Sequence, residues 1–398
     1  MESIDNVSIL LSLSLMVFLF WVLVVLDIPR RWPAHHRLVL SARTSGNSLA
    51  ARDTAVIIPA RNEEDCVREC LFSLLEQKFV RLLYIDDCSI DRTRAIAQEL
   101  INASAAAKAQ VIAGKPTPGD WSGKLHALAQ GIAIICADND AKNIRWFLFT
   151  DADILHPKGS LSALRTLAAQ GSYDMVSVMV RLRADSFWEK LLIPPFVYFF
   201  QLLYPFRRVS HPSAKYAAAA GGCLLISREM IVKLNGLEMI RNAVIDDISL
   251  ARKVREAGGR LWLGICPEME SRRAYPKLKD IVQMVARTAF TQLRYRASLL
   301  FICLAGLLLF LISPPWLCLW AVGAGQSVAL LLATGAWALQ AYMFYPVVRH
   351  HRVKKIYALS LPLASILYFW MTFLSAWNHW RGKGVVWKGR RLGASSNC

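Results

Sequence analysis

Hydrophobic and polar positions form a regular pattern over the middle of the chain. Short apolar runs at residues 54–60, 80–86, 109–114 and 144–150 are separated by stretches with helical periodicity at 63–77, 91–100 and 122–137. A short continuous apolar run is typical of a strand that is buried on both faces. Alternation of such strands with helices predicts an α/β fold with a doubly wound, mostly parallel sheet. The same pattern continues with strands at 174–182 and 217–227 and a helix at 244–257 that a further strand follows.

Longer apolar segments lie on either side of this pattern. Residues 9–26 carry no charge and are about long enough to cross a hydrocarbon core of ~30 Å. Acidic residues precede this segment and "PRRWPAHHR" follows it, which is the reverse of a signal peptide. We therefore expect an uncleaved transmembrane anchor over residues 1–27, followed by a basic linker over residues 28–53 on the cytoplasmic side.

The C-terminal part, residues 298–378, is predicted to form membrane helices. Residues 298–347 have room for two spans joined near 323–327, and residues 356–378 have room for a third. Basic clusters flank this third segment, and the positive-inside rule favours the cytoplasm for both of them. Either the segment, which Pro362 and Ser365 interrupt, is re-entrant or interfacial, or one cluster is outside. We favour the first alternative, which makes residues 379–398 a basic cytoplasmic tail.

Two other segments have the character of a membrane surface. Residues 187–206 are aromatic and apolar, and Pro194-Pro195 is expected to break a helix there into pieces too short to span. We interpret this segment as a membrane-facing apolar insertion, with a buried core segment as the alternative. Residues 276–297 have the pattern of a basic amphipathic helix, which suits an interfacial position.

Composition agrees with a membrane-associated protein. The chain has 398 residues, of which 55% are hydrophobic, and a formal net charge of +18. In a chain this apolar, an anionic membrane surface is the expected partner of the positive charge. No motif of a nucleic-acid-binding protein is present, and we expect no nucleic-acid partner.

Polar side chains follow three of the predicted strands. Because ligands of such sheets bind outside the carboxyl ends of the strands, these clusters are expected to converge on one edge. Two carboxylates one residue apart at a strand end can hold a divalent cation together with substrate phosphates. A polar turn is the alternative for each cluster taken alone. The clusters are Pro59-Ala60-Arg61-Asn62-Glu63, Asp86-Asp87 and Asp151-Ala152-Asp153.

Three further features add to this edge. Asp86 can accept hydrogen bonds from a base or a ribose, whereas Asp91 is expected to cap the following helix. Lys124 lies near a predicted helix N-terminus, and a cation there suits a diphosphate, with an ordinary surface lysine as the alternative. Asp246-Asp247 opens a helix, so capping is one interpretation. In the other, Asp247 is a general base that deprotonates an acceptor hydroxyl.

Five segments together resemble the signature blocks of family-2 glycosyltransferases with a GT-A fold. In chain order they are "VIIPARNEE", "YIDDCSIDRT", "SGKLHALAQG", "TDADILHP" and "IDDISLARKVREAGG". The resemblance implies a GT-A domain over residues 54–275. More narrowly, "AAAAGGCLLISRE", "MVARTAFTQLRYR" and "HWRGKGVVWKGR" are similar to segments of the hopene-associated glycosyltransferases of bacterial hopanoid gene clusters.

The resemblance also implies ligands and residue roles. The donor is expected to be a nucleotide sugar, UDP-linked, and the cofactor a divalent metal, Mn²⁺ or Mg²⁺. Asp153, with Asp151, matches the metal motif, and Asp247 matches the catalytic base. The residues implied in donor binding are Pro59, Ala60, Arg61, Glu63, Asp86, Asp87, Lys124 and Asp151.

Two departures from the family pattern stand out. Asp246 occupies the position where the family usually has Glu. Processive members carry Q-x-x-R-W, whereas "QLRYR" has Gln292 but places arginines at 294 and 296 and lacks the Trp. This argues against a processive synthase and leaves Asp246, Gln292 and Arg294 as candidate contacts to the acceptor or the diphosphate.

The resulting hypothesis is an inverting transfer of a sugar to a lipid acceptor at the cytoplasmic face of a bacterial inner membrane. The resemblance to the hopene-associated enzymes implies that this lipid is related to hopanoids. A nucleotidyltransferase is disfavoured because "IPARNEE" contains no glycine for a phosphate loop. A non-catalytic membrane scaffold or lipid carrier on the same fold is the other alternative. All the acidic positions are present, so nothing in the sequence supports a degenerate site.

Overall fold

The computed structural model describes residues 2–27, 36–40, 53–104 and 108–383, and the backbone of 386–387 and 390–391. The chain divides into two compact units. We call unit 1 the one formed by Met1–Trp32, Arg183–Leu203 and Ala274–Gly384. Unit 2 is formed by Pro33–Leu182, Tyr204–Arg273 and Val385–Cys398. Most of the predicted linker (28–53) and of the predicted tail (379–398) lies outside the described residues.

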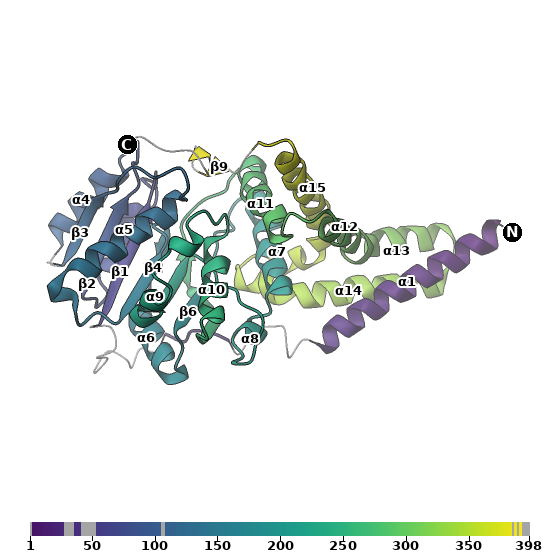
Figure 1. Cartoon of the computed structure of the whole chain (residues 1–398). Coiled ribbons are helices and arrows are strands. Elements are labelled where there is room, and N and C mark those ends of the chain that lie inside the picture. Colours follow the sequence, from purple (N-terminus) through teal and green to yellow (C-terminus); the bar gives the residue numbers. More distant parts are fainter. Residues whose placement is uncertain are drawn as a thin grey trace. The chain divides into compact units, whose positions relative to one another are not determined.

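Unit 2 is built on an eight-stranded sheet with the strand order β3-β2-β1-β4-β7-β6-β8-β5 (Figure 1). Strand β7 runs antiparallel to β4 and to β6, and β5 runs antiparallel to β8, while the other neighbours are parallel. The strands are β1 Thr54–Ala60, β2 Arg81–Asp86, β3 Ala109–Ala113, β4 Trp146–Thr150, β5 Ile154–Leu155, β6 Met175–Arg181, β7 Cys223–Ser227 and β8 Leu261–Ser271. A separate pair joins β9 (Val386–Trp387) to β10 (Arg390–Arg391).

This topology brings several strand ends to one edge. Since β7 is antiparallel to both of its neighbours, β6 and β8 run in the same direction as β1, β2 and β4. Their carboxyl ends therefore lie at a common edge of the sheet. We call this edge the rim; its strands end at Ala60, Asp86, Thr150, Arg181 and Ser271.

Helices cover both faces of this sheet, as the apolar runs predict. In β1, Val56 and Ile58 belong to one buried cluster, whereas Ala55 and Ile57 belong to the other. Side chains alternate across a strand, so a strand covered on both faces is apolar throughout. The helices of unit 2 are α3 Val67–Leu75, α4 Thr93–Ala103, α5 Gly123–Ala137, α6 Ser160–Gly171, α8 Phe206–Val209, α9 Arg228–Lys233 and α10 Asp246–Glu256, with the short 3₁₀ turns Asn139–Ala141 and Glu238–Ile240.

The sequence predicted these elements with a few errors at their ends. The sheet is mostly parallel, as predicted, with β7 inserted antiparallel between β4 and β6. The helix expected from residue 63 begins at Val67, since residues 61–66 form a turn in which Asn62 has a φ of 51°. The last strand, β8, runs on to Ser271.

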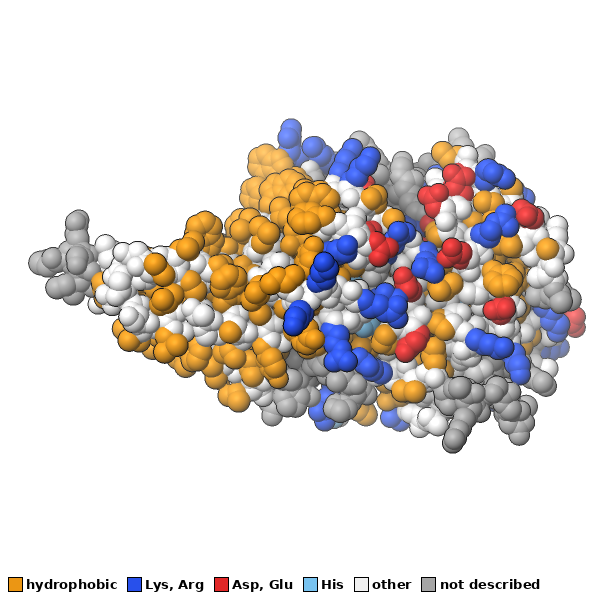
Figure 2. All heavy atoms as spheres, turned by 180° about the vertical axis from the view of Figure 1, so that it is seen from behind, with side chains coloured by type: hydrophobic (Ala, Val, Ile, Leu, Met, Phe, Trp, Pro, Cys, Tyr) orange, Lys and Arg blue, Asp and Glu red, His pale blue; other side chains and the backbone are white. Residues whose placement is uncertain are grey.

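Unit 1 consists of helices, and four of its helical stretches are long and apolar enough to cross a membrane: Asn6–Leu26, Ala297–Gly323, Ser327–His350 and Lys355–Trp380. Large hydrophobic side chains are exposed along all four, among them Leu23, Phe301, Leu331 and Phe373. Figure 2 shows many hydrophobic side chains on the visible face of unit 1, as expected for helices that face lipid. The elements are α1 Glu2–Leu26, α7 Phe187–Leu203, α11 Leu278–Gln292, α12 Ala297–Gly306, η6 Leu307–Ile312, α13 Ser313–Gly323, α14 Ser327–His350, η7 Lys355–Ser360 and α15 Leu361–Trp380.

The prediction that Pro194-Pro195 breaks the 187–206 segment is wrong. Helix α7 continues through both prolines. The prolines remove the hydrogen bonds to the carbonyls of Lys190 and Leu191. Packing within unit 1 holds this part of the helix, because Leu192 is buried and the hydroxyl of Tyr368 donates to its carbonyl at 2.8 Å. The middle of α7 therefore belongs to the core of unit 1, which was the alternative to a membrane-facing insertion.

The segment 356–378 is also more regular than expected. Pro362 lies in the first turn of α15, where a backbone N–H would have no acceptor within the helix, so a proline is tolerated there. The hydroxyl of Ser365 donates to the Leu361 carbonyl at 2.8 Å. Neither residue interrupts the helix, so the expected interruption is wrong, while the argument from the two flanking basic clusters stays a prediction. The two spans expected within 298–347 correspond to Ala297–Gly323 and Ser327–His350.

Candidate functional site

The first cluster of the rim connects the ends of β1 and β2. The guanidinium of Arg61 donates through Nη1 to the backbone oxygen of Asp87 at 2.6 Å and lies 4.0 Å from its carboxylate. Thr117 donates to the same carboxylate at 3.2 Å, and the backbone N–H of Asp87 donates to Ala60 at 2.8 Å. Arg61, Ala60 and Asp87 thus hold the two strand ends together, with Pro59 buried inside β1.

Asp86 differs from its neighbour. Its side chain is almost fully buried, and its Oδ2 accepts only a long 3.4 Å hydrogen bond from the N–H of Ser89. Its Oδ1 has no hydrogen-bond partner within the described part of the chain. Leaving a buried carboxylate oxygen without a donor is costly, so this atom is suited to accept a hydrogen bond from a ligand.

The predicted role of Asp91 agrees with the geometry: its carboxylate accepts from the N–H of Thr93 at 3.0 Å, at the start of α4. Such a hydrogen bond satisfies one of the unpaired donors of a helix N-terminus. It also holds the pKa of Asp91 below its usual value, against the opposing effect of partial burial. Asp91 is thus a capping residue.

Lys124 joins two of the acidic clusters. It lies in the first turn of α5, which Ser122 caps by accepting from the N–H of Leu125. Its ammonium is 2.8 Å from Asp151, 3.3 Å from Asp246 and 3.4 Å from the backbone oxygen of Gly221. Burial lowers the pKa of Lys124, but the two carboxylates outweigh it and raise that pKa above its usual range. The ammonium is therefore charged at any physiological pH.

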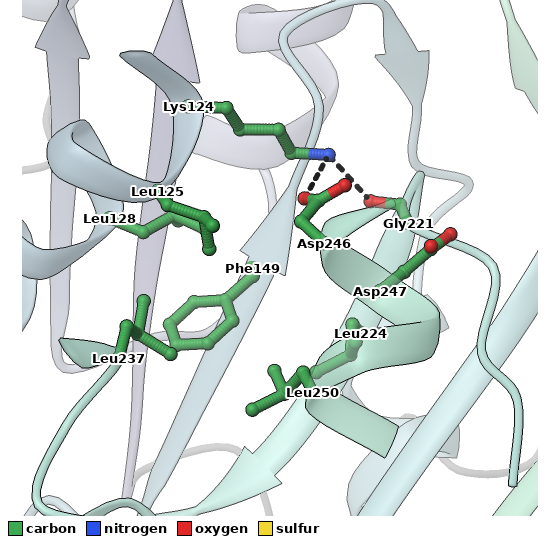
Figure 3. Close-up of a pocket in the computed structure, with 10 residues that line it drawn as sticks. All are labelled: Lys124, Leu125, Leu128, Phe149, Gly221, Leu224, Leu237, Asp246, Asp247 and Leu250. Atoms are coloured by element: carbon green, nitrogen blue, oxygen red, sulfur yellow. Dashed lines mark hydrogen bonds and ion pairs between the residues drawn. The ribbon is translucent and has the colours of Figure 1, made fainter. Parts of the chain in front are cut away.

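Asp246 and Asp247 begin α10 and differ in their partners (Figure 3). The carboxylate of Asp246 reaches Lys124, whereas that of Asp247 diverges from it and accepts from the N–H of Ile248 at 2.8 Å. Burial, and next the charge of Asp246, raise the pKa of Asp247 to about 7, while Lys124 opposes the shift. A carboxyl group with a pKa near neutrality is suited to accept a proton in a reaction.

Both residues line a pocket whose floor is apolar. In Figure 3, Phe149 from β4 and Leu224 from β7 lie below the charged groups, and Leu125 and Leu128 from α5 lie beside them. The lining residues are Lys124, Leu125, Leu128, Phe149, Gly221, Leu224, Leu237, Asp246, Asp247 and Leu250. Apolar side chains lower the local dielectric constant, which strengthens the electrostatic interactions above them.

Asp153 is held by residues that the sequence did not suggest. Ser271 donates its hydroxyl to Oδ2 of Asp153 at 2.6 Å, and the Nε of Arg273 lies 3.4 Å from the same atom. Arg273 also forms a salt bridge with Glu63. Both Ser271 and Arg273 are at the carboxyl end of β8. Both residues lie in the segment "ESRRAYP", to which the sequence analysis assigned no role.

The two remaining candidates, Gln292 and Arg294, belong to unit 1. Gln292 is the last residue of α11, and Arg294 follows it with a φ of 54°. Their proposed contacts to an acceptor or diphosphate remain predictions from the sequence.

The rim has properties that a divalent cation would complement. Seven carboxylates belong to the candidate site, and within the described part of the chain three cations pair with them, Arg61, Lys124 and Arg273. The carboxylates are Glu63, Asp86, Asp87, Asp151, Asp153, Asp246 and Asp247. A diphosphate would be repelled by this excess unless further positive charge came with it. No group of three or more His, Cys, Asp or Glu side chains among the described residues is arranged to hold a metal. The residues thus fit an ion held by Asp151 and Asp153 that takes its other oxygen ligands from a diphosphate.

Comparison with known proteins finds similarities in the sheet-bearing region. Residues 55–234 match the family model "Glycosyl transferase family 2". The 4,4'-diaponeurosporenoate glycosyltransferase of Staphylococcus aureus (strain USA300) is 30% identical over 137 residues, which cover 34% of this chain and 33% of that relative. The same enzyme from strain bovine RF122 is 28% identical over 141 residues, 35% of this chain and 34% of the relative. The chain thus matches about a third of the length of these relatives.

Among solved structures, the mannosyltransferase PcManGT from Pyrobaculum calidifontis, in complex with GDP-Man and Mn²⁺, resembles this chain with a TM-score of 0.52. The likeness covers 95% of this chain and 99% of that one at 16% sequence identity, so it concerns the fold. The fold of the chain is that of GT-A glycosyltransferases, with a mixed sheet and candidate membrane helices. Asp246, Asp247 and Arg273 lie beyond the residues that match the family model.

Proposed function

We propose that this chain, which carries a glycosyltransferase family 2 domain on a GT-A-like sheet, transfers a sugar from a nucleotide-sugar donor to a lipid acceptor by inverting displacement. One observation carries the proposal. Lys124, which both Asp151 and Asp246 contact, lies at the same rim as Asp247, whose pKa is about 7. A cation for a leaving diphosphate and a base for an attacking hydroxyl thus come from adjacent elements.

The donor is proposed to bind along the strand ends. The buried Oδ1 of Asp86 is suited to an N–H or O–H group of the nucleoside. Lys124 stabilises the diphosphate, together with a divalent ion, Mn²⁺ or Mg²⁺, held by Asp153 and Asp151. When bound, such an ion neutralises the charge that develops on the departing diphosphate. The nucleotide is proposed to lie over the loops that follow β1 and β2. These loops are held by the contact of Arg61 with Asp87 and by the salt bridge of Glu63 with Arg273.

Asp247 supplies the proton transfer. Its carboxylate takes the proton of the acceptor hydroxyl while the hydroxyl oxygen forms a bond to the anomeric carbon of the sugar. The bond between that carbon and the diphosphate oxygen breaks on the opposite face, so the configuration inverts. Asp246 neutralises part of the charge of Lys124 and raises the pKa of Asp247.

The acceptor is proposed to be a lipid because unit 1 has four helical stretches that can cross a membrane. The charge pattern around the first, and the net charge of +18, favour the bacterial inner membrane, an anionic surface and a cytoplasmic catalytic domain. The sequence resemblance points to a hopanoid-related acceptor, whereas the relatives are named for 4,4'-diaponeurosporenoate, a carboxylate. These acceptors differ in chemistry, since a hydroxyl keeps its proton at neutral pH and a carboxylic acid does not.

The test is a transfer assay on the full-length chain in lipid vesicles, with Mn²⁺ and a panel of UDP- and GDP-sugars. Extracted bacterial lipids serve as acceptors, and the product is identified by mass spectrometry. Transfer that disappears in Asp247→Asn, with donor binding retained, supports the proposal and a hydroxyl acceptor. If transfer persists in this variant, Asp247 is not the base, as an acceptor carboxylate would allow.

The rival function is a membrane scaffold or lipid carrier without catalysis. In that case the chain neither binds nor turns over any nucleotide sugar of the panel at any Mn²⁺ concentration. Measuring nucleotide binding separately from turnover therefore distinguishes the two functions.

A further inference from the structure

Arg273 lies at the rim although no sequence block of the expected site contains it. It follows β8, which ends at Ser271 and runs in the same direction as β1, β2 and β4. The topology thus brings Arg273 to the edge where the donor is proposed to bind. Unlike Arg272, which pairs with Glu69 and Glu270, Arg273 contacts two residues of the candidate site.

These two contacts connect separate parts of the rim. The guanidinium of Arg273 forms a salt bridge with Glu63, beyond the end of β1. Its Nε is 3.4 Å from Oδ2 of Asp153, beyond the end of β4. The backbone N–H of Arg273 donates to the hydroxyl of Ser271 at 3.3 Å, and this hydroxyl donates to Asp153. The side chain is therefore held in a defined position.

Arg273 is also the most exposed member of this group. Its side chain is 27% exposed, whereas those of Glu63 and Asp153 are 9% and 7% exposed. Solvent therefore reaches part of the Arg273 side chain, whereas the two carboxylates that it contacts are almost wholly buried.

The arrangement repeats that of Lys124. Each carboxylate of the Asp151-Ala152-Asp153 motif is paired with one cation from another segment, Lys124 for Asp151 and Arg273 for Asp153. One cation per carboxylate leaves no positive charge in excess for a diphosphate. When the carboxylate of Asp153 turns to a divalent ion, a nearby guanidinium is repelled by that ion and attracted to the anionic ligand.

We propose that Arg273 is a second phosphate-binding cation of the donor site, which exchanges its contact with Asp153 for the diphosphate of the nucleotide. Glu63 keeps the guanidinium at the rim during this exchange. The planar fork of an arginine matches two phosphate oxygens at once, which a lysine cannot do. This inference rests on the proposed function, because it requires a nucleotide diphosphate at the rim.

The experiment compares Arg273→Gln with Arg272→Gln, a matched loss of one charge at the neighbouring residue. Binding of UDP and of GDP to the full chain is measured by calorimetry with Mn²⁺ present. Binding of uridine and guanosine is measured by competition. Arg273→Gln is expected to weaken binding of the preferred diphosphate about 10- to 100-fold, as for loss of a charge-assisted hydrogen bond. Nucleoside binding stays within about twofold of the wild type, and Arg272→Gln binds both ligands normally.

Three further measurements decide between explanations. Arg273→Lys is expected to recover only part of the lost affinity, since it restores the charge without the fork. Binding of Mn²⁺ alone, followed by electron paramagnetic resonance, is expected to be unchanged or tighter in Arg273→Gln, because a competing cation has been removed. A merely structural role would lower nucleoside affinity and the melting temperature together, and that result would overturn the proposal.

Two other outcomes also overturn it. Unchanged diphosphate affinity in Arg273→Gln excludes a donor contact, and a raised KM for the lipid alone would assign the cation to an acceptor phosphate instead. If the wild-type chain binds neither UDP nor GDP, the proposed function itself fails. These two failures are distinguished by the wild-type titration.

Discussion

Two of the acidic pairs at the rim of unit 2 differ in how their negative charge is compensated. In the Asp151-Ala152-Asp153 motif each carboxylate contacts a cation, Lys124 or Arg273. In Asp246-Asp247 only the first carboxylate does, and no salt bridge to Asp247 is found within the described ranges. The first pair is thus prepared to exchange its cations for others, while the second keeps one carboxyl group with a pKa of about 7.

Residue type and spacing alone therefore do not determine the charge partners or the pKa values of an acidic pair. A helix N-terminus favours a carboxylate, and by itself this effect lowers a carboxyl pKa. At Asp247, burial and the neighbouring charge of Asp246 dominate, so its pKa rises instead. Four experiments test whether the two pairs have these different roles.

The largest effect is expected from Asp247→Asn compared with Asp246→Asn. Because an amide cannot take a proton, Asp247→Asn should lower kcat about 10²- to 10⁴-fold while the dissociation constant of the donor stays unchanged. Asp246→Asn should cost less, since it removes a partner of Lys124 and not the base. Transfer rates and donor binding are measured on both variants. Equal losses would mean that the pair acts as a unit.

The next largest effect concerns the other pair. Asp153→Ala is expected to abolish the strengthening of UDP binding by Mn²⁺, whereas Asp151→Ala should weaken UDP binding only about tenfold. Titrations of UDP with and without Mn²⁺ give both numbers. If Asp151→Ala is the more damaging change, Asp151 is the main ligand of the ion.

A smaller effect is expected in the pH dependence of transfer. Asp247 acts as a base only when deprotonated, and its pKa is raised to about 7, so kcat/KM should rise as pH increases through about 7. Lys124 stays protonated throughout, because its pKa is raised further above neutrality. In Asp246→Asn the rising limb should move to lower pH, since one of the charges that raise the pKa of Asp247 is gone. A limb that stays in place would contradict this assignment.

The smallest effect is expected from Gly221→Ala. A Cβ at this position would lie 3.1 Å from Oδ2 of Asp247 and 3.2 Å from Nζ of Lys124. The two groups must shift slightly, so a few-fold fall in kcat is expected, with little change in the melting temperature. Gly306→Ala is the control, because a Cβ there has no atom within 4 Å. Equal activity of the two variants would show that the position of these groups tolerates such a shift.

From the sequence alone we could predict the α/β fold, the strand ends that carry Asp86 and Asp151, and the apolar segments of unit 1. These features depend on local periodicity and on the chain directions of parallel strands, which a sequence records directly. It also predicted a helix start at Asp246, because a change from apolar to helical periodicity is local information.

Only the tertiary structure decided which charges meet. Because β7 is inserted antiparallel, β6 and β8 run in the same direction as β4, and Arg273 reaches Asp153, which lies 120 positions earlier in the chain. Helix α7 continues through Pro194-Pro195, and Tyr368 and other residues distant in the sequence pack against it. Ion pairs, burial and the pKa of Asp247 result from such distant contacts. They depend on distances that arise only when the chain is folded, and no local pattern of residues encodes them.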